Sequence, residues 1–299
     1  MVMEILTRYQ SSSILLLQKN LATIIICLLF AACTKDATVK LPDTAPKPVL
    51  VCFVSPEDPF IRVKLTNSVP LYSSSTKNYP FEIKDAEVMI SNGITSAQVP
   101  WYKDSVGYLL STSLFPIKPG TSYTLQVKIP DGRVLNAVTT VPVEDFPAID
   151  FSLIRQTVDS GDFGISFSFD YTMKWKDVAG SKNYYRGVIY NLYADSSLGA
   201  DTTVQQSTEF FETDEGRDGG EIRLNGQGYL FYSSGSPIPA IGSNFIGYLM
   251  LGNRDYYLYH KDLFQDMGDN PFSEAKINFT NIEGGIGCFG AYRMAKKRF

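Results

Sequence analysis

Hydrophobic and polar side chains alternate at a period of two in many short segments after Val49. In residues 60–68, for example, Ile61, Val63 and Leu65 fall on one face of an extended chain. Successive side chains of a β-strand point to opposite faces of its sheet, so this pattern indicates strands with one buried face. The segments in the first half of the chain are residues 49–54, 60–68, 86–91, 95–102, 108–111, 123–129 and 134–141. This density is typical of an immunoglobulin-like or transthyretin-like β-sandwich.

A second β-rich region follows a proline-containing segment, residues 141–147. Pro142 and Pro147 lack the N–H that a central strand donates to its neighbour, so this segment predicts a domain boundary. Beyond it, residues 164–175 form the longest alternating segment of the sequence. Further strands are expected at residues 184–192, 228–232 and 245–251.

The sequence therefore predicts a mainly β protein with two tandem β-sandwich domains of the immunoglobulin-like or fibronectin III-like type. We place the first domain at residues 49–143 and the second at residues 147–292, followed by a basic tail at residues 293–299.

One segment of the second domain departs from the strand pattern. In residues 253–266, Tyr256, Tyr259 and Leu263 recur near the 3.6-residue period of a helix. Asn253 is a suitable N-cap, because its side chain can accept a hydrogen bond from a free backbone N–H of the first turn. We therefore expect one amphipathic helix in the second domain.

The N-terminus predicts where the protein resides. Residues 21–32 form an apolar run that is shorter than the roughly 20 residues of a membrane span but suits the core of a secretion signal. The run ends Ala31-Ala32-Cys33, which is typical of a bacterial lipoprotein signal. We expect a signal peptide at residues 1–32 and a lipid on Cys33. The alternative is an uncleaved anchor. Lys35-Asp36 resembles the short charged signals that direct some lipoproteins to the outer membrane, which implies an outer-membrane location.

Residues 33–48 contain three prolines and show no periodicity. Such a composition favours an extended, solvated segment, so we interpret it as a lipidated tether.

Charge and histidine content restrict the possible functions. Lys and Arg number 27 against 31 Asp and Glu, so there is no general electrostatic basis for binding nucleic acid. His260 is the single histidine of the sequence, which excludes metal sites built from several histidines. The sequence also has no GxSxG motif. We therefore expect a structural role for His260, no catalytic residues and no cofactor.

The cysteines and acidic residues leave narrower questions. Once the signal is removed and Cys33 is lipidated, Cys52 and Cys288 remain. Both lie in apolar segments, where they are either small buried hydrophobic residues or partners in one disulfide. A second group is acidic and could offer oxygen ligands to calcium; it comprises Asp214, Glu215, Asp218 and Glu221. Their spacing does not match an EF-hand loop, so we predict a solvated loop and no metal site.

Aromatic residues suggest where a ligand could bind. Trp101, Tyr102 and Tyr108 in the first domain could form a platform for a sugar or a peptide, together with Tyr72 and Tyr79 in the preceding loop. Their alternative role is packing in the core or on a sheet face. Exposed surface is expected at two long polar loops, residues 71–81 and 210–228.

The C-terminal region carries the most specific pattern. Residues 281–292 read NIEGGIGCFGAY and follow NPF at residues 270–272. This combination resembles the closing signature of a Bacteroidota lipoprotein family called domain of unknown function 4249. Residues 85–90, residues 119–125 and the Tyr-rich residues 254–264 also resemble parts of that family. Cys288 departs from the bulkier residue that is common at its position.

The resemblance implies a signal-anchored, two-domain β protein with no established activity, often encoded beside a TonB-dependent outer-membrane receptor. It favours a non-enzymatic cell-envelope lipoprotein that assists such a receptor or binds an external ligand. The alternative is an adhesin or a surface hydrolase built on the same sandwiches. The four clustered glycines predict a bulged edge strand, or else a backbone surface that a ligand approaches closely; they are Gly284, Gly285, Gly287 and Gly290.

Overall fold

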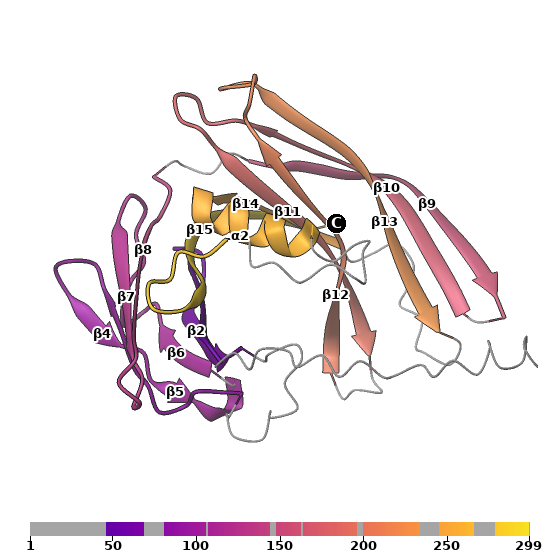
Figure 1. Cartoon of the computed structure of the whole chain (residues 1–299). Helices are drawn as coiled ribbons and strands as arrows, with labels where there is room; N and C mark the ends of the chain where they lie inside the picture. The colour runs from indigo at the N-terminus through magenta and orange to yellow at the C-terminus, as the bar shows by residue number, and fades with distance from the viewer. Residues whose placement is uncertain are drawn as a thin grey trace, which may run out of the picture. The chain divides into compact units, whose positions relative to one another are not determined.

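The structure is a computed structural model that describes residues 46–68, 81–105, 107–143, 148–162, 164–195, 200–233, 245–265 and 279–298. The mainly β fold is confirmed, because these residues form three β-sheets and helix α2 (Figure 1). The immunoglobulin or fibronectin III type of the two predicted sandwiches stays a prediction. Within the described residues, α2 is too short and too polar to span a membrane, and so is every other helical turn.

The largest sheet has eight strands in the order β12-β11-β14-β15-β1-β2-β6-β5. Their bounds are β1 Pro48–Val54, β2 Phe60–Asn67, β5 Trp101–Tyr102, β6 Gly107–Ser111, β11 Tyr184–Asp195, β12 Ala200–Thr213, β14 Phe245–Gly252 and β15 Ile286–Arg298. β1, β2, β5 and β6 come from the first predicted domain, whereas β11, β12, β14 and β15 come from the second. One continuous sheet therefore contains strands from both predicted domains.

Strand β15 joins the two halves of this sheet. Its first part pairs in parallel with β1, from Ile286 opposite Val49 to Ala291 opposite Val54. Its second part pairs antiparallel with β14, from Tyr292 opposite Gly252 onward. Residues 293–298, which the sequence analysis assigned to a basic tail, thus continue this strand.

The remaining strands form two smaller sheets. The four-stranded sheet has the order β4-β3-β7-β8, and the three-stranded sheet has the order β13-β10-β9. Their bounds are β3 Glu87–Ser91, β4 Ser96–Gln98, β7 Ser122–Lys128, β8 Val134–Thr140, β9 Asp150–Gly161, β10 Gly164–Lys176 and β13 Glu221–Ser233. The single strand predicted at residues 95–102 is wrong, since its ends lie in different sheets. Pro100 separates β4 from β5 because it has no N–H to donate.

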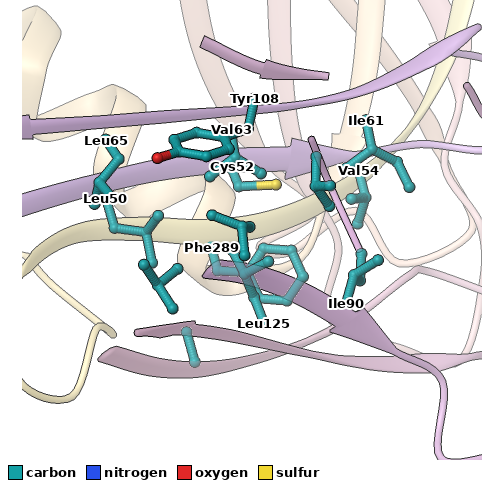
Figure 2. Close-up of a cluster of buried hydrophobic side chains, with 14 of the residues drawn as sticks. Leu50, Cys52, Val54, Ile61, Val63, Leu65, Ile90, Tyr108, Leu125 and Phe289 are labelled. Carbon is teal, nitrogen blue, oxygen red and sulfur yellow. The ribbon is translucent and has the colours of Figure 1, made fainter. Parts of the chain in front are cut away.

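The first core lies between the four-stranded sheet and the β1, β2, β6 and β15 part of the large sheet. Figure 2 shows Leu50 and Cys52 of β1, with Phe289 of β15, facing Leu125 of β7. Tyr108 is also buried. Its hydroxyl is satisfied there, because it donates to the carbonyl of Ile83 at 2.9 Å and accepts from the Ala86 N–H. The regular alternation of β1 and β2 accounts for this buried face.

The second core lies between the three-stranded sheet and strands β11 and β14. Trp175 packs edge-to-face against Tyr185 with ring centroids 5.3 Å apart, and both side chains are buried. Along β15, Phe289 contributes to the first core and Ala295 packs on the second. Residues an even number apart point to the same side of a strand, so both cores lie on one face of the large sheet.

Helix α2, Arg254–Gln265, lies on the opposite face and contacts β15, β14 and β11 (Figure 1). The predicted N-cap is confirmed, because the Asn253 side-chain oxygen accepts a hydrogen bond from the Tyr256 N–H at 3.0 Å. The predicted apolar face is only partly right. Tyr256 and Tyr257 are buried, but Leu263 is 51% exposed because it lies in the last turn of the helix.

The long polar loop predicted at residues 210–228 is wrong. β12 continues to Thr213 and β13 begins at Glu221, so the connection is only residues 214–220. Both strands lie at the edge of their sheets, where polar side chains can face water. Residues 71–80 of the other predicted loop lie outside the described residues.

Candidate functional site

The face of the large sheet that carries α2, here called the helix face, is rich in aromatic side chains. They reach this face through the alternation of β1, β11, β14 and β15, which sends their neighbours into the two cores. Phe53, Tyr190, Tyr248, Tyr292 and Tyr256 of α2 gather in one cluster there. Tyr256 and Tyr292 lie with their ring centroids 4.9 Å apart.

A pocket of about 430 Å³ opens on the β1–β2 side of the helix face. Its apolar lining includes Val51, Phe53 and Phe60. Its polar lining includes Asp58, Arg62, Lys64 and Tyr292. Apolar walls with a few polar groups that fix orientation are typical of small-ligand sites.

The carboxylate of Asp58 is held in place by β15. It accepts a hydrogen bond from the hydroxyl of Tyr292. Burial raises the pKa of Asp58, while this hydrogen bond and the nearby Arg62 charge act in the opposite direction. Burial and the neighbouring Asp58 charge raise the pKa of Tyr292, so its hydroxyl stays protonated and donates at neutral pH.

The turn between β1 and β2 is fixed by the residue before Asp58. Glu57 receives a hydrogen bond from Arg293 Nε at 2.8 Å and one from Ser55 Oγ at 2.6 Å. Glu57 and Arg293 thus form an ion pair, and both side chains are mostly shielded from solvent. The turn is therefore attached to β15, which orders the pocket wall before any ligand arrives.

Two cations lie beside the apolar lining of the pocket. The Arg62 guanidinium lies 5.5 Å from the Phe60 ring centroid, and Arg62 and Lys64 are both exposed. The Asp58 charge is already engaged by Tyr292. The arrangement suits a ligand, or a segment of a partner, with an apolar body and an anionic group.

A buried polar network adjoins the pocket under α2. Arg186 pairs with Glu209 and donates to the Tyr256 hydroxyl at 2.7 Å. Burial raises the pKa of Tyr256 to about 12. The ring centroids of His260 and Phe53 lie 4.8 Å apart. Burial, together with the Arg186 charge, lowers the pKa of His260 to about 3. His260 is therefore neutral at physiological pH.

Comparison with known proteins assigns the chain to a family. The model of the family described as a domain of unknown function, DUF4249, matches residues 34–298. The chain belongs to this family. No curated protein matches it. One matching solved structure is the chitinase ChiA74 from Bacillus thuringiensis, at 16% identity and a TM-score of 0.19, which covers 68% of this chain and 28% of the chitinase. The DUF4249 chain thus spans about 28% of that structure's length, and at this TM-score the likeness carries no argument.

Of the aromatic residues proposed from the DUF4249 sequence, Tyr108 lines the pocket, whereas Trp101 and Tyr102 do not. Trp101 packs on the first core, 5.2 Å from the Tyr108 ring, with the Lys84 ammonium 5.7 Å from its ring centroid. Tyr102 is 50% exposed on the edge strand β5. Tyr72 and Tyr79, like the predicted lipidation site Cys33, lie outside the described residues.

Sequence reasoning missed the pocket residues of the DUF4249 protein for a physical reason. Phe60, Arg62 and Lys64 form the outward face of a regular strand, and such a face normally contacts only water. The available signal was Glu57-Asp58 between Pro56 and Pro59, a rigid turn with two adjacent acids.

The two cysteines left open by the sequence are both free and buried. Cys52 faces the first core. Cys288 points to the helix face, where its Sγ lies 3.7 Å from the Asp255 carbonyl oxygen. The two thiols therefore lie on opposite faces of the sheet, and burial raises the pKa of both.

Of the four acids considered for calcium, the DUF4249 structure brings two together. Asp214 and Asp218 form a group with Asp177, which the sequence analysis had not considered. Glu215 and Glu221 are not members of this group.

Proposed function

We propose that this DUF4249 protein is a non-enzymatic lipoprotein of the outer membrane that uses the pocket on the helix face to bind a partner or an external ligand. A TonB-dependent receptor is the preferred partner. The observation that carries the proposal is the pocket itself. It combines an apolar lining, two exposed cations and a carboxylate fixed by the Glu57–Arg293 and Asp58–Tyr292 contacts.

Anchoring is supported by the N-terminal sequence and by the extent of the family match. The match begins at residue 34, directly after Cys33. The apolar run at residues 21–32 precedes that cysteine. A lipid on Cys33 would then hold the folded chain at a membrane through the proline-containing residues 33–48, since each buried methylene contributes about 0.8 kcal/mol.

The anchor is tested by replacing the acceptor thiol. In cells fed a labelled fatty acid, wild-type protein should carry label and sediment with outer membranes. Cys33→Ala should carry none and should be released by an alkaline wash. A variant that stays in washed membranes would show that residues 21–32 form an uncleaved anchor.

The binding role is tested by reversing one charge at the pocket. We expect a TonB-dependent receptor to copurify with the wild-type lipoprotein after cross-linking in outer membranes, and Arg62→Glu to weaken its recovery at least tenfold. Arg223→Glu is the matched control, because Arg223 is also an exposed arginine within a strand but does not line the pocket. Equal recovery with Arg62→Glu and wild type would exclude the pocket as the binding site.

The alternative, an adhesin or a surface hydrolase, gives different results in the same cells. A hydrolytic activity that His260→Ala removes without unfolding the protein would favour the hydrolase. Loss of cell adhesion without loss of a receptor partner would favour the adhesin.

A further inference from the structure

Three carboxylates from two connections meet at one end of the second core. Asp177 directly follows β10, while Asp214 and Asp218 belong to the connection between β12 and β13. One oxygen from each carboxylate lies within 4.8 Å of the other two. Carboxylates this close repel one another strongly unless a cation or protons offset their charge.

The second observation is the isolation of Asp214. Its side chain is only 6% exposed. Within the described residues, its carboxylate has no hydrogen-bond or ion-pair partner, while its oxygen points toward Asp177 and Asp218. Burying an ionised carboxylate without a partner is strongly unfavourable, so the arrangement calls for a positive ligand.

The other two carboxylates are held by hydrogen bonds from both connections. Asp177 accepts three hydrogen bonds: from the Tyr185 hydroxyl at 2.7 Å, the Asn183 side-chain amide at 3.1 Å and the Gly219 N–H at 2.8 Å. Asp218 accepts from the Gly180 N–H at 2.7 Å. A carboxylate has about four lone-pair sites, so Asp177 and Asp218 keep oxygen sites available after these bonds. The site is thus fixed in place before any ion binds.

The donor set and its place in the fold favour one kind of ion. All three donors are oxygens, the ligands that hard cations such as calcium and magnesium take, whereas transition metals favour nitrogen and sulfur. Oxygens within 4.8 Å of one another can share one calcium ion, because calcium holds its oxygen ligands at about 2.3–2.6 Å. Calcium also accepts the irregular geometry of loop residues, while magnesium requires a near-ideal octahedron.

We propose that Asp177, Asp214 and Asp218 bind one calcium ion, which ties residues 177–183 to residues 214–220. This replaces our expectation from the sequence that the acidic loop is merely solvated. The ion would have a structural role, since it would join the connections at one end of β10, β11, β12 and β13.

The test uses the full-length lipoprotein in detergent after removal of divalent cations with a chelator. Isothermal titration with calcium chloride should show one site on the wild type, and added calcium should raise its melting temperature. Asp214→Asn removes the buried charge at almost constant shape and should weaken binding at least tenfold. Glu215→Gln is the matched control and should bind like wild type, because this neighbouring acid is exposed and outside the group.

Asp218→Asn is the second variant, because Asp218 is exposed and its replacement leaves the buried Asp177 bonds in place. It should also lose at least tenfold in affinity while folding normally. The proposal fails if the wild type shows neither binding nor a thermal shift at millimolar calcium, or if both Asp variants bind like wild type. Equal affinity for magnesium would overturn the assignment to calcium.

Discussion

Two glycines with nearly the same backbone conformation allow strain and crowding to be measured separately. Gly284 has φ of +81° and Gly93 has φ of +84°. An added Cβ at Gly93 meets nothing within 4 Å, whereas at Gly284 it would lie against the carbonyl of Val134 and 3.5 Å from a methyl of Leu135. Left-handed backbone costs an alanine about 1–2 kcal/mol, partly offset by a gain of about 0.4–1 kcal/mol from stiffening the unfolded chain.

We therefore expect Gly93→Ala to destabilise the protein by about 1 kcal/mol. Gly284→Ala should add about 1–3 kcal/mol for displaced backbone, giving a total of about 2–4 kcal/mol. Urea unfolding of both variants, followed by tryptophan fluorescence, measures the two free energies of unfolding. Equal losses would show that Gly284 is needed only for its φ, and that β8 does not crowd the start of β15.

Three further outcomes follow from the contacts. Asn253→Ala removes the N-cap and the 2.7 Å bond to Thr139, so we expect a loss of about 2–3 kcal/mol in the free energy of unfolding, while Asn253→Asp keeps the cap and loses less. Burial lowers the pKa of His260 from 6.5 to about 3, so the unfolded chain binds a proton that the folded chain does not; stability should fall as pH drops from 6.5 toward 3, and His260→Phe should flatten this fall in thermal melts at several pH values. Because burial raises the pKa of Cys52 and Cys288, neither thiol should react with iodoacetamide, by mass spectrometry, until the protein is unfolded.

Local patterns in the sequence predicted the elements whose structure is set locally. The alternation in residues 164–175 corresponds to β10, and Asn253 caps the predicted helix. Family signatures were equally informative, since the match extends over residues 34–298. In each case the signal is carried by neighbouring residues, which share the same strand, turn or helix.

The errors concern edges and distant contacts. The polar residues of β12 and β13 suggested a loop because an edge strand has one side open to water and does not need a clean apolar pattern. The clustered glycines suggested an edge strand, but β15 lies between β14 and β1 in the large sheet. Positive φ is found at Gly284 and Gly287. At Gly285 the constraint is space, because an added Cβ would lie 2.7 Å from the Pro48 carbonyl oxygen. The need for glycine at position 285 thus comes from contact with β1, which is distant in the sequence.

The candidate sites likewise depend on contacts between segments that are distant in the sequence. The pocket requires β1, β2 and β15 to lie side by side, and the acidic group requires Asp177 beside Asp214. No periodic pattern in the sequence indicates that these segments lie side by side. A turn with two adjacent acids, or an acidic loop, marks a region of interest but does not indicate what folds against it.

The parallel pairing of β1 with β15 has a consequence for synthesis. β15 leaves the ribosome after every other described strand, about 230 residues after β1; at about 5–20 residues per second this interval is roughly 10–50 s. Throughout it, the backbone groups of β1 that later bond to β15 have no partner from this chain, and the first core lacks Phe289 and Ala291. Any sheet that the first half forms in this interval therefore has an open edge at β1, and the strand that closes this edge is translated only near the end of the chain.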